Sequence, residues 1–405
     1  MRGRCGRWAA LAAIVTIATS PAVLAAGDPL RSDQYGLDRI SLTTALNAAR
    51  GAGVIIAVLD TGVNLNHEDL RNQLLPGRDF VDDDDHPMDA NGHGTHVAGI
   101  AAAESGNGLG VEGVAPGAKI MPLRVLDTDG TGVESDVAAA IRHALLQAAQ
   151  RRMALVINLS LTDMDVQGGS SSRQIRDAIR EAWVGGAVVV AAAGNEALPF
   201  SDYPAEGPNV ISVGATDDRD RRATFSNRGA NVVAPGEKVI STFWDAEDPR
   251  NNAVYAIGSG TSQAAPHAAG VAALLMSTGL SNERTVDRIL RTADDLGPPG
   301  PDDEYGFGRL NAARALGTGV AGRPVSDASG IPSVGEGKFE PIATSPSPGP
   351  VAAAPVDARS PSRTVPMLLA LALLVVAYSA VRVGALGHPS REEAAPVPWS
   401  FDPFE

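Results

Sequence analysis

Five short, almost uniformly apolar runs between about residues 34 and 317 limit the folds that this chain can adopt. They cover residues 54–59, 120–126, 154–160, 187–192 and 210–214. Runs of this length and composition are typical of strands that are buried on both faces of a sheet. Apolar residues at helical spacing predict helices over 136–152, 172–183 and 264–276. Because strands and helices alternate, we predict one α/β domain built on a doubly wound parallel sheet.

Three polar motifs lie where the ligands of such a fold are expected, outside the carboxyl ends of the strands. Asp60 ends the first apolar run and is followed by Thr-Gly. His93 stands between two glycines in Asn-Gly-His-Gly-Thr-His, and Ser262 lies in Gly-Ser-Gly-Thr-Ser-Gln-Ala-Ala-Pro. The serine is expected at the start of a buried helix, where free N–H groups and the helix dipole favour developing negative charge.

Each motif has a plain structural interpretation when it stands alone, as a turn former or a helix cap. Together they favour nucleophilic catalysis, because a hydroxyl needs an imidazole to take its proton and the imidazole needs a carboxylate to fix its tautomer. Asp-Thr-Gly also marks aspartic proteases, but those need a second such loop and this sequence has none. A zinc-protease helix is disfavoured, because no glutamate stands between His93 and His96.

The chain order Asp60, His93, Ser262 resembles that of the subtilases, the subtilisin-like serine proteases, and the longer motifs are especially similar to the thermitase-like branch. The resemblance covers about residues 34–316. It implies a subtilisin-like single catalytic domain with Asp60 as the orienting acid, His93 as the general base and acid, and Ser262 as the nucleophile. It also implies that Asn195, in Ala-Ala-Ala-Gly-Asn, donates a side-chain hydrogen bond to the oxyanion.

The same resemblance assigns the substrate-binding residues Ser160, Leu161, Gly194 and Asp202. Ser160-Leu161 is followed by Thr-Asp where the family has two glycines, so the substrate range is less constrained than the reaction type. Asp202 aligns near the floor of the primary specificity pocket. A carboxylate there would favour Arg or Lys, because buried charges are tolerated mainly when paired. The alternative is an outward-facing loop acid.

Two groups of oxygen-bearing side chains resemble calcium loops of thermitase-like relatives. Asp79 and Asp84 lie in an acidic loop before the His93 motif, and Asp69 and Asn107 resemble ligands of the family's tighter site. Hard oxygen ligands gathered from loops suit calcium better than magnesium. Calcium is therefore the expected structural cofactor. The alternative for the acidic loop is a solvated surface.

The composition of the remaining residues predicts separate segments before and after the peptidase domain. Residues 1–25 carry three arginines, an apolar run and small residues at the end, typical of a cleavable signal peptide that would take the single cysteine, Cys5, with it. We expect an N-terminal extension over 26–50 and the peptidase domain over 51–317. Gly, Pro and Ser make up 21 of the 46 residues of 318–363, which predicts a linker.

A second targeting signal follows the linker. We predict a transmembrane helix over 364–386, because its first 18 residues carry no charge and just suffice to cross the hydrocarbon. A short tail over 387–405 ends the chain. With the signal peptide, this helix predicts a single-pass protein of the cell membrane whose catalytic domain is extracytoplasmic.

The sequence thus predicts an extracytoplasmic serine endopeptidase that hydrolyses protein or peptide substrates through an acyl-enzyme and is tethered to the membrane by its C-terminal helix. A net charge of −14 disfavours nucleic acid as a partner, because a phosphate backbone would be repelled. Two alternatives stay open. One is a mycosin-like processing protease of a secretion system, and the other is a catalytically silent, protein-binding pseudoprotease.

Overall fold

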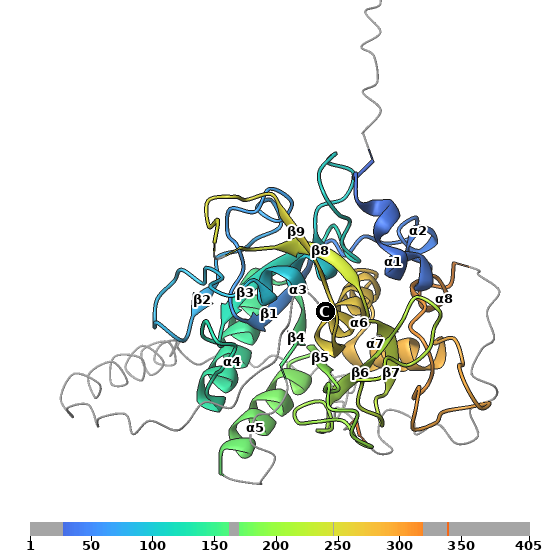
Figure 1. Cartoon of the computed structure of the whole chain (residues 1–405). Coiled ribbons are helices and arrows are strands. Elements are labelled where there is room, and N and C mark those ends of the chain that lie inside the picture. Colours follow the sequence, from blue (N-terminus) through green and yellow to red (C-terminus); the bar gives the residue numbers. More distant parts are fainter. Residues whose placement is uncertain (1–26, 162–169, 246, 319–337, 340–405) are drawn as a thin grey trace, which may run out of the picture. The chain divides into compact units, whose positions relative to one another are not determined.

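The computed structural model describes residues 27–161, 170–245, 247–318 and 338–339 (Figure 1). The predicted signal peptide, the transmembrane helix, the tail and all but three residues of the predicted linker lie outside these ranges. Within the described residues, no helix has both the length and the apolar composition that a membrane crossing requires.

A seven-stranded parallel sheet organises the domain, with the strand order β2-β3-β1-β4-β5-β6-β7. The strands are β1 (Val54–Asp60), β2 (Arg78–Asp79), β3 (Lys119–Arg124), β4 (Ala154–Leu159), β5 (Val188–Ala192), β6 (Val210–Thr216) and β7 (Val232–Pro235). The five apolar runs form β1, β3, β4, β5 and β6. The predicted α/β fold with a parallel sheet is confirmed.

Helices cover both faces of the sheet. They are α1 (Tyr35–Arg39), α2 (Leu42–Ala45), α3 (His93–Ala102), α4 (Glu134–Arg151), α5 (Ser170–Val184), α6 (Thr261–Met276), α7 (Asn282–Arg291) and α8 (Ala312–Ala315), after a short 3-10 turn over Arg31–Asp33. Figure 1 shows α4 and α5 together on one side of the sheet, with α3 and α6 packed together on the other. Ile55, Ala57 and Leu59 of β1 belong to the core beneath α4 and α5. Alternate residues of β1 face α3 and α6, so the strand is buried on both sides.

A two-stranded antiparallel hairpin, β8 (Val239–Phe243) and β9 (Val254–Gly258), was not predicted. The hydroxyls of Ser241 and Thr242 donate to backbone carbonyls of α3 at 2.8 and 2.7 Å. Since β9 ends at Gly258 and α6 begins at Thr261, the hairpin ties the start of α6 to α3. These two helices carry Ser262 and His93.

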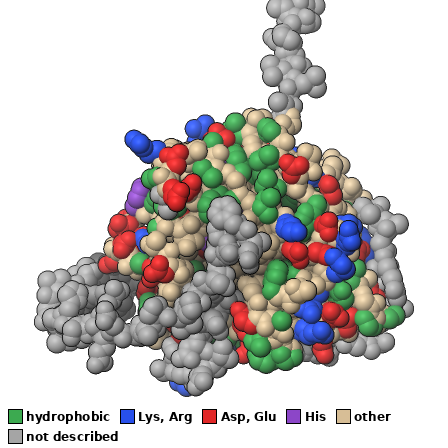
Figure 2. Space-filling view, viewed as in Figure 1, with side chains coloured by type: hydrophobic (Ala, Val, Ile, Leu, Met, Phe, Trp, Pro, Cys, Tyr) green, Lys and Arg blue, Asp and Glu red, His purple; other side chains and the backbone are tan. Residues whose placement is uncertain are grey.

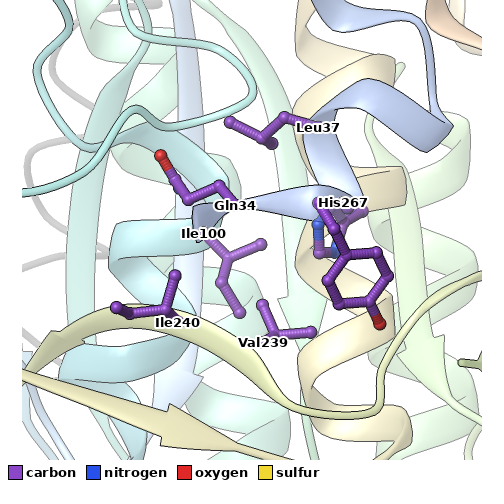
Figure 3. A pocket seen from close by; sticks show the side chains of 8 residues that line it. Gln34, Leu37, Ile100, Val239, Ile240 and His267 are labelled. Carbon is purple, nitrogen blue, oxygen red and sulfur yellow. The ribbon is translucent and has the colours of Figure 1, made fainter. Parts of the chain in front are cut away.

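The N-terminal extension packs as part of the domain. The Tyr35 hydroxyl donates to the Glu237 carbonyl at 2.6 Å, and Gln34 exchanges two hydrogen bonds with the backbone of Glu112. A cavity of about 10 Å³ remains beneath it, lined partly by Ile100 and His267 (Figure 3). That volume holds about one water molecule. The extension is therefore closely fitted against α3, β8 and α6.

Candidate active site

Asp60 and His93 form a direct carboxylate–imidazole pair. Asp60 is the last residue of β1 and is fully buried, while His93 is the first residue of α3. The Oδ1 atom of Asp60 lies 2.7 Å from Nδ1 of His93 and also accepts the backbone N–H of Thr61 at 2.8 Å. A proton on Nδ1 leaves Nε2 of a neutral ring with a lone pair that can act as a base. This is the arrangement that the sequence motifs predicted for these two residues.

A second buried carboxylate, Asp89, holds this pair in place. Its Oδ1 accepts hydrogen bonds from the Thr61 hydroxyl at 2.8 Å and from the Gly92 backbone at 2.9 Å, and its Oδ2 accepts the Thr95 backbone N–H at 2.9 Å. Asp89 thus joins the residue after Asp60 to the first turn of α3. Asp89 was not predicted as a site residue, because no local pattern shows which carboxylate will cap that turn.

The electrostatics of His93 favour its charged form. Burial alone would lower the pKa of the imidazole, but the charge and hydrogen bond of Asp60, with a further contribution from Asp89, raise the pKa of His93 above its usual value. The side chain remains 16% exposed, whereas Asp60 is inaccessible. His93 can therefore act as a base, because its side chain is partly accessible and the buried Asp60 occupies only Nδ1.

Ser262 lies one strand away from Asp60, beside Ser160. Leu59 and Leu159 are paired in register between β1 and β4, so the residues that follow them, Asp60 and Ser160, lie side by side. The Ser160 hydroxyl donates to the Ser262 carbonyl at 2.9 Å, and the Ser262 hydroxyl lies 3.4 Å from the Ser160 carbonyl. Ser262 is the second residue of α6, where backbone N–H groups have no acceptor within the helix.

Asn195 is fixed by the residue that precedes Ser262. Its side-chain oxygen accepts the backbone N–H of Thr261 at 2.8 Å and the Thr261 hydroxyl at 3.0 Å. Because an N–H can only donate, the atom facing Thr261 must be the amide oxygen. The amide nitrogen therefore occupies the opposite end of the group and can donate to a bound molecule, as the predicted oxyanion role requires.

Gly194 and Asp202, both predicted to bind substrate, are in contact. Gly194 has φ +108°, and a Cβ there would lie 2.2 Å from Oδ2 of Asp202, so only glycine fits. Asp202 is 4% exposed and accepts a hydrogen bond from Nδ2 of Asn227 at 3.0 Å. Such burial does not fit the alternative of an outward-facing loop acid. Leu161 is buried in the core under α4 and α5, and the Thr-Asp pair after it lies outside the described residues.

The predicted calcium residues Asp69 and Asn107 meet at a loop over 106–111. Asp69 accepts Nδ2 of Asn107 at 2.8 Å and the Val111 backbone N–H at 2.9 Å. Asp28, which sequence analysis did not assign, accepts the backbone N–H groups of Gly106 and Asn107 at 2.8 and 3.1 Å. Burial raises the pKa of Asp69 to about 6, and the charge of Asp28 adds to that shift. Two carboxylates and an amide thus share one loop, with the amide nitrogen toward Asp69 and the amide oxygen accepting the Leu109 N–H at 2.8 Å.

The other predicted pair, Asp79 and Asp84, has a different environment. Asp79 is buried and forms an ion pair with Arg124 at 2.8 Å, so its charge is already compensated. Asp84 is exposed, in an acidic loop over 82–85 that gathers with other acids at the left of Figure 2. This arrangement fits the predicted calcium loop poorly. No group of three or more Asp, Glu, His or Cys side chains suited to a metal occurs in the described part of the chain.

A buried acid paired to an imidazole on α3, and a serine in the first turn of the neighbouring helix α6, are the components of a serine hydrolase on a parallel α/β sheet. Comparison with known proteins narrows the class, since the sequence profile of the Subtilase family matches residues 51–308. The chain therefore belongs to the subtilase family and is a serine proteinase.

Individual relatives agree with this assignment. The chain is 44% identical over 286 residues to the thermophilic serine proteinase of Bacillus sp. (strain AK1), covering 70% of this chain and 67% of that protein. It is 42% identical over 288 residues to thermitase of Thermoactinomyces vulgaris, covering 70% and 96%. Among solved structures, sphericase matches with a TM-score of 0.61 at 34% identity, covering 69% of this chain and 99% of its own.

Proposed function

We propose that this proteinase is an endopeptidase that uses Ser262 as its nucleophile. Oγ of Ser262 attacks the scissile carbonyl carbon while His93 takes the hydroxyl proton on Nε2. The C–N bond then breaks as His93 returns that proton to the leaving amine, and water hydrolyses the resulting ester by the same route. Asp60 stabilises the charged imidazole, and Nδ2 of Asn195 donates to the oxyanion.

The observation that carries this proposal is the 2.7 Å contact between Asp60 and His93, together with the anchoring of Asn195 on the residue before Ser262. The test is covalent labelling with a fluorophosphonate, followed by mass spectrometry of the labelled peptide. The label should sit on Ser262 and be lost in Ser262→Ala. Ser277→Ala, at the other end of α6, is the matched control and should label normally. A folded protein that neither labels nor cleaves peptides would support the pseudoprotease alternative.

We also propose that calcium stabilises the fold at the loop shared by Asp28, Asp69 and Asn107. Two buried carboxylates with like charges approach the same loop, and a bound cation would relieve their repulsion. The loop contacts both the N-terminal extension and the main domain. A cation there would therefore link the extension to the rest of the molecule.

The proposed location rests on sequence alone. Residues 1–25 have the form of a signal peptide, and residues 364–386 are long and apolar enough to span a bilayer. We propose a membrane-tethered enzyme with its catalytic domain outside the cytoplasmic membrane. A mycosin-like processing role is the alternative that shares this layout. Protease treatment of intact spheroplasts should release the catalytic domain, and protection of the domain with clipping of the tail would reverse the orientation.

A further inference from the structure

Two residues from the predicted linker, Lys338 and Phe339, lie against the catalytic domain. The ammonium group of Lys338 donates to three oxygens, the carbonyl of Ala205 at 2.6 Å, Oδ1 of Asn231 at 2.9 Å and Oγ of Ser212 at 3.2 Å. The backbone carbonyl of Lys338 accepts the N–H of Asn209 at 2.8 Å. All three N–H bonds of the ammonium group are therefore satisfied by the domain.

Phe339 completes the contact with an aromatic packing interaction. Its ring centroid lies 5.6 Å from the ring of Trp183, at an interplanar angle of 45°. Phe339 is only 7% exposed and Trp183 only 1%. Packing one aromatic ring against another stabilises the contact beyond the gain from removing apolar area from water. The two residues thus combine a polar and an apolar anchor.

The surface that receives them is held together by hydrogen bonds within the domain. Asn231 Oδ1 accepts both the backbone N–H and the hydroxyl of Ser212 at 3.0 Å, and the Asn231 N–H donates to Oγ of Ser212 at 2.9 Å. Trp183, at the end of α5, is held by Nδ2 of Asn282, which donates to its carbonyl at 2.8 Å. We call Trp183, Ala205, Asn209, Ser212 and Asn231 the tail socket.

The tail socket and the active site lie at opposite ends of the parallel strands. Asn209 directly precedes β6 and Asn231 directly precedes β7, so both stand at the amino ends of their strands. Asp60 ends β1 and Asn195 follows β5, so both stand at carboxyl ends. Because all these strands are parallel, Lys338 and Phe339 are held at the amino ends of the strands, and the catalytic residues lie at the carboxyl ends.

The charge of Lys338 makes this contact selective. Its three acceptors are neutral oxygens, so burial lowers the pKa of the ammonium group to about 7, with the nearby Glu206 acting in the opposite direction. A buried cation is tolerated only when its hydrogen bonds are complete. A side chain with another length or donor geometry would not place a donor on all three oxygens at once.

We propose that Lys338–Phe339 is a docking motif that fastens the segment after the catalytic domain to the tail socket. Docking holds these two residues at the amino ends of the strands, away from the active site. It also shields the Lys338–Phe339 peptide bond from proteinases, including a second copy of this enzyme. This inference does not depend on the proposed catalytic roles.

The composition of the chain allows a direct test, because its three lysines are Lys119, Lys238 and Lys338. The full chain, carrying Ser262→Ala to prevent self-cleavage, is treated with an amine-acetylating reagent, and the rate at each lysine is followed by mass spectrometry. Lys238 is exposed and serves as the internal reference. Lys338 should react at least about tenfold more slowly, because reaction requires local opening of the socket.

Phe339→Ala should bring the reactivity of Lys338 close to that of Lys238, and should speed cleavage by a lysine-specific endoproteinase at the same bond. Phe200→Ala, at a phenylalanine that is 51% exposed, is the matched control and should change neither rate. Equal reactivity of Lys338 and Lys238 in the unaltered segment would overturn the proposal. Slow reactivity that persists in Phe339→Ala would overturn it as well, because the two residues would then not act as one motif.

Discussion

The side-chain oxygen of Asn195 lies 2.8 Å from the backbone nitrogen of Thr261, the residue before Ser262. The Thr261 hydroxyl, which reaches the same oxygen, also accepts the backbone N–H of Gly194 at 3.1 Å. Thr261 thus orients the amide and ties its backbone to α6 at the point where the serine sits. The amide nitrogen is left as the group that can meet negative charge on a substrate.

Replacing that nitrogen tests its role. Asn195→Asp keeps an oxygen for Thr261 but replaces the donor with a carboxylate that repels the oxyanion, so kcat should fall by at least about 10²–10³-fold with little change in KM, because the donor acts mainly in the transition state. Steady-state kinetics on a peptide substrate provide the measurement. An unchanged kcat would refute the assignment of Asn195.

The raised pKa of His93 predicts the acid limb of the pH profile. The imidazole must be neutral to act as a base, so kcat/KM should fall as the pH drops through a pKa above 6.5. Asp89→Asn removes one charge that raises this pKa and should shift the limb to lower pH. It should also lower the melting temperature. If the NH2 group of the new asparagine faces the Thr95 N–H, that buried donor loses its acceptor, which costs about 1–3 kcal/mol of stability. A limb that does not move would exclude an electrostatic contribution from Asp89.

Asp202 offers a test of substrate preference. If its buried carboxylate faces the primary specificity pocket, cleavage after Arg or Lys should gain about 1–3 kcal/mol over cleavage after Phe or Leu. Profiling a peptide library with the parent enzyme and with Asp202→Asn measures the difference. If the preference for basic residues is absent, or survives in the variant, the carboxylate of Asp202 does not determine specificity and only packs against Gly194.

Calcium dependence should trace to one of the two predicted loops. A ligand that binds only the folded state stabilises it by about 2.7 kcal/mol at one hundred times its dissociation constant. Chelation should therefore lower the melting temperature, and Asp69→Asn should abolish that dependence. Asp84→Ala should leave it intact, because Asp79 in the same loop is already paired with Arg124. Identical melting curves with chelator and with millimolar calcium would contradict the proposal.

The sequence predicted the features that local patterns encode. Uniformly apolar runs identified β1, β3, β4, β5 and β6, because burial on both faces leaves a mark in each strand. The β8–β9 hairpin escaped prediction although β9 reads Val-Tyr-Ala-Ile-Gly, because most of β9 is only partly buried and it pairs with β8 outside the main sheet. β7, with four residues, is too short for its period to stand out.

Within the site, the sequence motifs identified the residues of the Asp60–His93 pair but not their supports. Asp89 and Thr261 act through contacts that form only when the chain folds. Asp28 bonds to the loop over 106–111, and its partner Gly106 lies 78 positions further along the chain. The docked Lys338 was missed for a related reason. The composition of residues 318–363 as a whole predicts a linker. It does not show that Lys338 and Phe339 bind a surface whose residues lie more than 100 positions earlier in the chain.

The most direct test of the central claim is the pre-steady-state release of a chromogenic leaving group from an activated peptide ester. If Ser262 is the nucleophile, the enzyme should give a burst of one equivalent per molecule and an acyl adduct on Ser262 in acid-quenched samples, and Ser262→Ala should give neither. Turnover that proceeds in Ser262→Ala with an undiminished burst would contradict the assignment of Ser262 as the nucleophile.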